Sequence, residues 1–190
     1  MTEARKWRLS LAALAISTAL LNLINLAKGL LGESNSRFLG FIIMAKLQAE
    51  AMKRAKIASD KRNPFFLYVD EFQSLATDNF TVMLSEARKF GLGLVLANQF
   101  ISQITNQKII QAVFGNVGSI MSFRLGRLDS ELVETQFLPH FDRIHLSNQP
   151  NWQIAARLNV AGKSLPPFSL NTLKSDIQPD KQLAGEVRRR

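Results

Sequence analysis

The chain has 190 residues, of which 46% are hydrophobic and 21% charged, and it contains no cysteine. This length allows one domain with a substantial core, the composition is typical of a folded soluble protein, and the lack of cysteine excludes disulfides and thiolate metal sites. The net charge of +9 and the pI of about 10.3 indicate a polyanionic partner, nucleic acid or anionic lipid, with simple solubility charge as the alternative. The two histidines, His140 and His145, lie in one short segment without carboxylates at ligand spacing, so no histidine-based metal site is expected.

The N-terminal segment joins a basic start to an apolar run over residues 9–21. This combination resembles a signal peptide or signal anchor. The run of 13 residues is shorter than the about 20 that a membrane-spanning helix needs. We therefore favour a buried helix over residues 9–20 and a strand over residues 21–26.

A helix is predicted over residues 37–59, because its apolar side chains recur at helical spacing. Residues 28–32 form a turn before it, and Ser34, Asn35 and Ser36 are candidate N-caps. The polar face of this helix is basic and could contact DNA, although a solvated face is the commoner explanation. Strand, helix and following strand together predict a βαβ unit.

The stretch over residues 65–72 is the one around which the chain is organised. Apolar and aromatic residues run directly into Asp70 and Glu71, which predicts a central strand buried on both faces with two carboxylates at its C-terminal end. Adjacent carboxylates repel each other, and a cation would relieve that repulsion. This is the chemistry of a Walker B element, in which Asp holds Mg²⁺ and Glu polarises the attacking water. A solvated turn that happens to contain both residues is the alternative.

The next strand delivers polar side chains to the same edge of the sheet. A helix over residues 80–90 with Gly91 as its C-cap precedes a buried strand over residues 92–97, which ends in Asn98 and Gln99. Gln99 could contact a γ-phosphate or a positioned water. The alternative is that Gln99 caps a helix predicted to begin at Ser102.

The remaining elements are shorter. We expect a third strand over residues 116–123 that ends at Arg124, a short helix over residues 129–137, and a half-buried edge strand over residues 152–160. A turn follows at residues 161–163, and two prolines then stop strand pairing. From Asn171 onward the chain is polar and ends in three arginines.

Several stretches occur in an order and at a spacing that resemble the C-terminal half of the motor domain of the HerA/FtsK superfamily, and most closely the TraD/TraG-type coupling proteins of type IV secretion and conjugation. The resemblance covers about residues 22–168 and rests on these stretches: 25–29, 32–40, 68–72, 84–92, 97–99 and 115–124. It implies a mostly parallel RecA-like α/β sheet of the P-loop NTPase kind, with helices on both faces. The implied domain organisation is an unmatched segment over residues 1–20, the half motor domain over residues 21–168 and a polar basic tail over residues 169–190.

The resemblance also implies roles for single residues. Asp70 corresponds to the Mg²⁺-associated carboxylate, Glu71 to the catalytic base and Gln99 to the γ-phosphate sensor. Arg88 matches an arginine finger that reaches into the neighbouring subunit's site, and dipole complementation at a helix C-terminus is its alternative role. Arg124 is a second finger candidate with less support.

The sequence departs from the family in one respect that bears on function. No Gly-x-x-x-x-Gly-Lys-Ser/Thr pattern occurs in the 190 residues, so the Walker A loop that cradles the phosphates is missing. We therefore expect no ATPase activity from the isolated chain, and an apolar edge or face of the sheet left open where the P-loop part would lie.

The first hypothesis is the C-terminal part of a ring-forming, ATP-driven DNA translocase or coupling protein. Its implied cofactors are ATP and Mg²⁺. Its implied partners are DNA, five further copies in a homo-hexamer, and relaxosome or secretion-channel proteins. The implied location is the cytoplasm or the cytoplasmic face of the inner membrane, reached through the missing N-terminal part. The alternatives are a catalytically inactive DNA- or relaxosome-binding module, a HerA-type DNA-repair helicase fragment, and a protein anchored to the membrane through residues 9–27.

Overall fold

The structure is a computed structural model that describes residues 24–26 and 28–173. The predictions for residues 9–21 and for the tail beyond residue 173 lie outside the described residues. The chain forms two compact units, Met1–Val117 and Gly118–Arg190. We describe each unit by itself.

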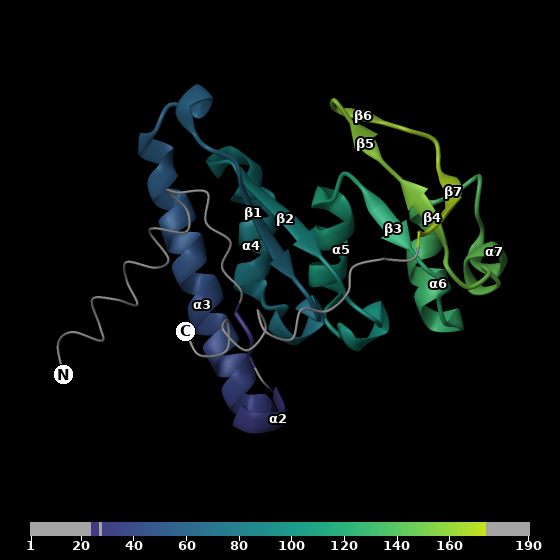
Figure 1. The fold of residues 1–190 in the computed structure, drawn as a ribbon, viewed down its shortest axis with the longest axis horizontal. Helices are drawn as coiled ribbons and strands as arrows, with labels where there is room; N and C mark the ends of the chain where they lie inside the picture. The colour runs from purple at the N-terminus through teal and green to yellow at the C-terminus, as the bar shows by residue number, and fades with distance from the viewer. Residues whose placement is uncertain (1–23, 27, 174–190) are drawn as a thin grey trace. The chain divides into compact units, whose positions relative to one another are not determined.

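The first unit is built from helices and two strands (Figure 1). Its elements in chain order are α2 (Lys28–Leu31), α3 (Glu33–Lys53), η1 (Arg54–Lys56), η2 (Ser59–Lys61), β1 (Phe65–Val69), η3 (Phe72–Leu75), α4 (Asp78–Glu86), η4 (Ala87–Phe90), β2 (Leu92–Leu96), η5 (Ile101–Gln103) and α5 (Gln107–Asn116). None of the helices in the described part of the chain has the length and apolar character to cross a membrane.

Helix α3 begins four residues earlier than the sequence predicts. Its N-cap is Gly32, in a conformation with φ 77°, and no side chain caps it. Ser36 lies within the helix instead, where it is buried and its hydroxyl donates to the carbonyl of Leu26. The cap prediction was wrong because glycine supplies the turn that a hydroxyl cap would otherwise mark. Residues 28–31 form the short helix α2 where a turn was expected over residues 28–32, and residues 24–26 are not in a strand.

The two strands of the first unit form a parallel pair. Phe65 lies opposite Leu92 and Val69 opposite Leu96 in an unbroken register. Helix α4 and the η4 turn connect the strands, so this βαβ unit follows β1 and does not precede it. Gly91 ends η4 with φ 67°, which confirms its predicted place as a C-cap.

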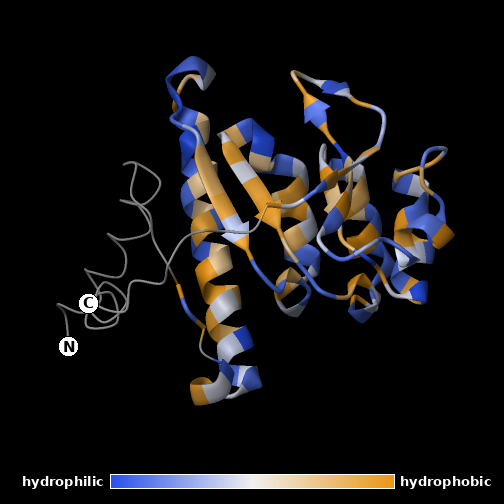
Figure 2. Ribbon diagram, turned by 45° about the vertical axis from the view of Figure 1, so that its right-hand side comes forward, coloured by the Kyte–Doolittle hydropathy of each residue, from blue (hydrophilic) through white to orange (hydrophobic). Residues whose placement is uncertain are grey.

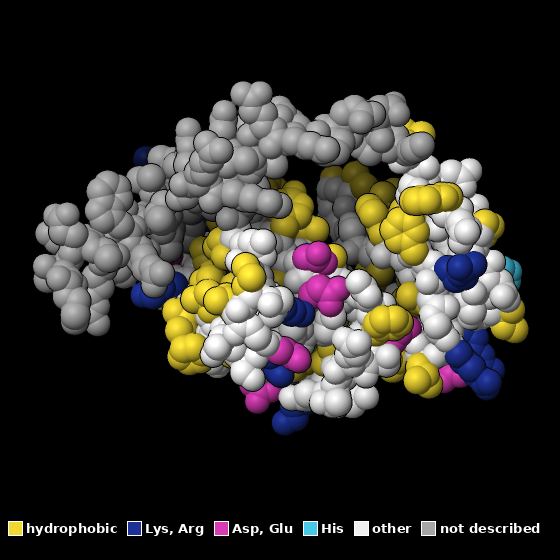
Figure 3. Space-filling view, turned by 60° about the horizontal axis from the view of Figure 1, so that its bottom comes forward, with side chains coloured by type: hydrophobic (Ala, Val, Ile, Leu, Met, Phe, Trp, Pro, Cys, Tyr) yellow, Lys and Arg dark blue, Asp and Glu magenta, His cyan; other side chains and the backbone are white. Residues whose placement is uncertain are grey.

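One face of this sheet is open. Val69 and Leu92 are buried, and a small cavity between α3, α4 and Leu92 shows that helices pack on their side. The other face exposes Phe66 by 60% and Tyr68 by 71%. The strand is therefore not buried on both faces, and the face that carries Phe66 and Tyr68 is apolar and exposed. Figure 2 shows the apolar strands as orange ribbon, and Figure 3 shows one face of the molecule on which yellow hydrophobic side chains reach the surface beside charged ones.

The second unit contains an antiparallel sheet in the order β3-β4-β7 and a small β5-β6 hairpin. Its elements are β3 (Ile120–Ser122), α6 (Arg127–Val133), η6 (Glu134–Gln136), α7 (Arg143–Ser147), β4 (Gln153–Arg157), β5 (Asn159–Val160), β6 (Lys163–Ser164) and β7 (Phe168–Asn171). The described strands therefore form one parallel and three antiparallel pairs, and the expectation of a mostly parallel sheet does not hold for them.

Strand β4 was predicted at the edge of a sheet, but it lies between β3 and β7. Ile154, Ala155 and Ala156 are consecutive and all buried, so both faces of β4 are covered. Strand β7 follows the two prolines, so the prolines end one hairpin without ending strand pairing. The turn predicted at residues 161–163 is present, with positive φ at Ala161 and Gly162.

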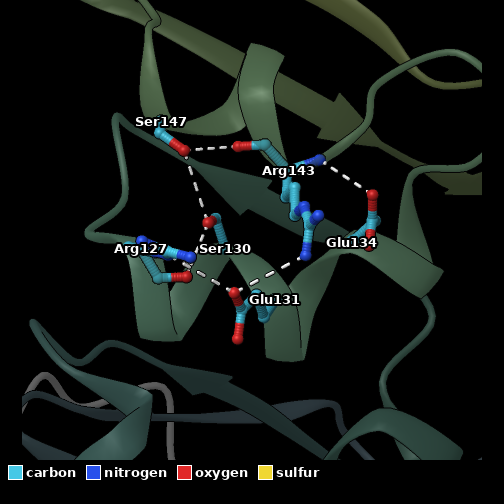
Figure 4. A network of polar contacts seen from close by, with 6 residues as sticks. All are labelled: Arg127, Ser130, Glu131, Glu134, Arg143 and Ser147. Atoms are coloured by element: carbon cyan, nitrogen blue, oxygen red, sulfur yellow. Dashed lines mark hydrogen bonds and ion pairs between the residues drawn. The ribbon is translucent and has the colours of Figure 1, made fainter.

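Polar contacts join α6 to α7 in the second unit (Figure 4). The carboxylate of Glu131 lies 3.7 Å from Arg127 and 3.6 Å from Arg143, and the backbone N–H of Arg143 donates to Glu134 at 3.0 Å. These side chains are largely exposed, so each ion pair contributes little free energy. The network links the two short helices α6 and α7.

Candidate functional site

The carboxyl ends of β1 and β2 bring three of the predicted site residues to one edge of the parallel sheet. The pairing continues past the strands, because the N–H of Ala97 donates to Val69 at 2.9 Å and the N–H of Phe72 donates to Ala97 at 3.1 Å. Asp70 and Glu71 lie between these two bonds, beside the segment that leads to Gln99. The edge where strands of an open α/β sheet end is where such folds place their ligands.

Glu71 has a left-handed backbone conformation, with φ 51° and ψ 42°. Its carbonyl accepts from the N–H of Ser74 at 3.0 Å and from the hydroxyl of Ser74 at 2.8 Å, which closes the turn into η3. Non-glycine residues seldom adopt this conformation, and such strain often occurs at functional positions.

The carboxylate of Glu71 is held by a neighbour that sequence reasoning missed. The side-chain amide of Gln73 donates to Glu71 Oε2 at 2.6 Å, and the same nitrogen lies 3.4 Å from Gln103 Oε1. The amide oxygen of Gln73 is buried without a hydrogen-bond partner among the described residues. The sequence signal for this contact was the position of Gln73, two residues after Glu71.

Asp70 is exposed at the same edge, and its Oδ1 accepts from the N–H of Glu71 at 2.9 Å. Its second oxygen is open to a ligand. Within residues 24–26 and 28–173 no group of three or more acidic, histidine or cysteine side chains could enclose a metal. Mg²⁺ commonly binds through one or two carboxylates together with water and phosphate oxygens, so this donor set fits Mg²⁺ that arrives with a nucleotide.

Gln99 is exposed just beyond β2. The predicted alternative, in which Gln99 caps the next helix, is wrong. Helix α5 begins at Gln107, and Asn106 caps it by accepting from the N–H of Lys108 at 3.0 Å. Gln99 is thus available for a ligand at the edge that carries Asp70 and Glu71.

Arg88 lies at the opposite end of the sheet from the carboxylates. It belongs to η4, which leads into the start of β2, and it lines a cavity together with Pro64 and Leu92 at the amino ends of the strands. Its side chain is exposed and makes no hydrogen bond or ion pair with the described residues. The five residues of β1 separate it from Asp70 by roughly 17 Å of strand. Arg124, the second candidate, belongs to the other unit, where its side chain is exposed.

Among the comparisons with known proteins, the comparison with solved structures gave matches. No family model and no curated protein matches the sequence. Among solved structures, the plasmid coupling protein TrwB in complex with a non-hydrolysable GTP analogue matches with a TM-score of 0.54 at 17% identity, over 73% of this chain and 38% of TrwB. The genome packaging NTPase B204 from Sulfolobus turreted icosahedral virus 2, in complex with AMPPCP, matches with a TM-score of 0.55 at 15% identity, over 86% of this chain and 72% of B204.

A further TrwB structure, in complex with ADP and Mg²⁺, matches at 19% identity with a TM-score of 0.52. At these identities the likeness concerns the fold. It confirms, at the level of the fold, the resemblance to conjugative coupling proteins that the sequence motifs predict. The chain spans about two fifths of the length of TrwB, and both neighbours were solved with nucleotides or their analogues.

Proposed function

We propose that this chain is the C-terminal part of an ATP-driven DNA translocase motor of the coupling-protein kind. The observation that carries the proposal is the shared edge of β1 and β2, where Asp70, Glu71 and Gln99 follow two paired parallel strands. Nucleotides occupy this edge in α/β folds, and the two structural neighbours are a coupling protein and a genome packaging NTPase.

Each of the three side chains has a chemical task in this proposal. Asp70 would hold Mg²⁺ through its free oxygen or through water, and the metal would neutralise charge on the phosphates. Glu71 would orient and polarise the attacking water, with its carboxylate kept in place by Gln73 at 2.6 Å. Gln99 would contact the γ-phosphate and so distinguish ATP from ADP.

Arg88 would act on a neighbouring subunit. Its distance from Asp70 along the strand prevents it from reaching the phosphates of its own subunit, while its free, exposed guanidinium is suited to a phosphate that another subunit presents. Hydrolysis would then depend on assembly of a ring, for which a hexamer is the expected form.

The missing phosphate-binding loop would come from another part of the motor. The sequence has no Walker A pattern, and the exposed Phe66, Tyr68 and Val95 form an apolar sheet face of the kind that parallel sheets normally cover. The part that supplies the loop would cover Tyr68 and Val95 or pair with a free strand edge, whereas Phe66 borders the cavity at the amino ends of the strands. The whole motor, not this chain alone, would bind and hydrolyse Mg·ATP.

The test is an ATPase measurement on the purified chain and on a longer product that includes the coding sequence upstream of Met1. We expect no turnover from the chain alone. We expect turnover that Glu71→Gln abolishes in a longer product that contains a P-loop. Glu50→Gln is the matched control, because Glu50 is a carboxylate on α3 far from the edge in sequence. If the chain alone hydrolyses ATP and Glu71→Gln abolishes this activity, the proposal that the chain carries only part of the nucleotide site is wrong. If the longer product is active and Glu71→Gln leaves its activity unchanged, the assignment of Glu71 as the base is wrong.

A DNA-binding module without catalysis is the second candidate, and the net charge of +9 favours it. Such a module would bind DNA in a salt-dependent manner, and substitution of Glu71 or Gln99 would leave that binding unchanged.

A further inference from the structure

A cavity of about 460 Å³ lies at the amino ends of β1 and β2, away from the acidic edge. Its volume falls within the range of small-molecule sites. Three of its lining side chains are cationic and none is a carboxylate: the cations are Arg62, Arg88 and Lys89. Its lining includes Leu92 and Gly93 at the start of β2 and Phe66 near the start of β1, the two strands drawn in Figure 1. The proposed function uses only Arg88 from this group.

The floor of the cavity is an aromatic ring laid over a glycine. A Cβ placed on Gly93 would come within 2.5 Å of Cδ1 and 2.7 Å of Cε1 of Phe66, so the ring occupies the space that a side chain at position 93 would take. Phe66 is nevertheless 60% exposed. The ring is therefore supported by the sheet on one side and open on the other, which is the arrangement on which nucleic acid bases stack.

Two arginines near the ring, Arg62 and Arg54, are held by hydrogen bonds to backbone carbonyls. Arg62 donates to the carbonyl of Ile57 at 2.8 Å and to that of Lys89. Behind it, Arg54 is buried and donates to the carbonyl of Gly91 at 3.2 Å and to that of Asn63. These bonds fix the backbone of the cavity wall.

Arg88 and Lys89 remain available to a ligand. Arg88 makes no hydrogen bond or ion pair with the described residues. Lys89 has one ion pair, to Glu86 at 3.7 Å, and its side chain is 69% exposed. A pair of this length between exposed groups is weak. Both cations can therefore turn to a phosphate without losing a strong contact.

We propose that this cavity binds a nucleotide unit, with the base stacked on Phe66 and the phosphate contacted by Arg88 and Lys89. The unit can belong to single-stranded nucleic acid or to a free nucleotide, since both present a base beside a phosphate. The assignment goes beyond the trans role of Arg88 in the proposed function, because a finger residue needs no aromatic floor and acts only in an assembled ring.

The experiment measures binding of a fluorescent oligothymidylate and of a fluorescent ATP analogue to the isolated full chain, with EDTA present to remove divalent metal. Two matched pairs of variants separate the cavity from the rest of the surface. Phe66→Ala is paired with Tyr68→Ala, an exposed aromatic residue on the same face of β1 that does not line the cavity. Arg88→Ala is paired with Arg37→Ala, an exposed arginine on α3 outside the cavity.

We expect Phe66→Ala to weaken binding about tenfold and Tyr68→Ala to have little effect. Arg88→Ala should weaken binding and lower the salt slope by about one, more than Arg37→Ala does. The probe that shows this pattern identifies the source of the nucleotide. Equal losses within each pair, or no binding of either probe, would overturn the assignment.

Gly93→Ala is a second test that removes no ring and no charge. The added methyl group must displace the Phe66 ring, so binding should fall although all three cations remain. Circular dichroism shows whether each variant is folded. Because these measurements need neither Mg²⁺ nor hydrolysis, failure of the cavity assignment leaves the proposed ATPase role untouched, and failure of the ATPase test leaves the cavity assignment untouched.

Discussion

The two ends of the parallel sheet differ in charge and in how their side chains are held. At the carboxyl ends, Asp70 and Glu71 take their hydrogen bonds from residues within three positions along the chain. At the amino ends, Arg54 reaches carbonyls 9 and 37 positions away. The acidic end is thus organised by local backbone geometry, and the basic end by long-range contacts.

This difference follows from chemistry. A tight turn after a strand can aim two short carboxylates without help from distant segments. Guanidinium groups carry five donors and can join several carbonyls at once, so a buried arginine can tie together a helix, a loop and a strand start. Burial and the nearby charge of Arg62 lower the pKa of Arg54 below its usual value, which reflects the cost of placing this group inside the protein.

Arg54→Ala should have the largest effect on stability, because it leaves the carbonyls of Asn63 and Gly91 without their charged donor. We expect a loss of about 3 kcal/mol in the free energy of unfolding, measured by urea denaturation. Arg37→Ala is the matched control, since Arg37 is exposed, and it should change stability by less than about 0.5 kcal/mol. Equal midpoints for the two variants would show that the basic end does not depend on Arg54.

The contrast between local contacts at the carboxyl ends of the strands and long-range contacts at their amino ends also explains how much of each end the sequence predicts. Strands β1 and β2, the cap at Gly91 and the edge that carries Asp70, Glu71 and Gln99 were predictable, because apolar runs, breakers and glycine act locally. The anchoring role of Arg54 was not, because its contacts cross 37 positions of chain and its basic neighbours on α3 resemble a solvated face.

In the second unit, too, the local sequence pattern did not predict a contact made by distant parts of the chain. Strand β4 was placed at an edge because hydrophobic and polar residues alternate over residues 152–160, yet Ala155 and Ala156 are both buried between two partner strands. Small side chains fit either environment, so local alternation does not report pairing on both sides. The prediction that β1 is buried on both faces was wrong for a related reason: burial depends on what covers a strand, and Tyr68 is exposed.

Glu71→Ala and Glu71→Gly test whether the acidic end stores backbone strain. Both variants remove the carboxylate and its bond to Gln73, so they differ in the cost of φ 51° and in the smaller, opposing loss of chain entropy that glycine suffers on folding. The glycine variant should be more stable by about 1 kcal/mol in urea denaturation, because glycine adopts this conformation without a Cβ clash. If alanine is as stable as glycine, the turn after Asp70 relaxes and the strain does not belong to the folded protein.

Gly91→Ala applies the same reasoning to the basic end. An alanine Cβ would meet its nearest atom at an ordinary 3.6 Å, so the expected loss of about 1 kcal/mol arises from φ 67° alone. Gly115→Ala is the control, because Gly115 lies in α5 with open space around it, and it should raise stability by about 0.5 kcal/mol. Thermal denaturation of the two variants should shift in opposite directions, and shifts of the same sign would contradict the conformational explanation.

The smallest effect is expected at Asp142 in the second unit, a carboxylate held, like those of the acidic end, by nearby residues. Its Oδ1 accepts from the N–H of His145 at 2.8 Å, and this bond, followed by the contact with the His145 ring, lowers the pKa of Asp142. A carboxyl whose pKa falls on folding stabilises the protein above its unfolded pKa, and this contribution disappears as the pH drops through the folded pKa. Asp142→Ala should therefore lower the thermal midpoint at neutral pH, and the difference from the unsubstituted chain should vanish in acid. Asp142→Asn retains a capping oxygen without the charge and should remove the pH dependence while keeping most of the stability, so a pH-dependent difference that survives in the asparagine variant would assign the effect to another group.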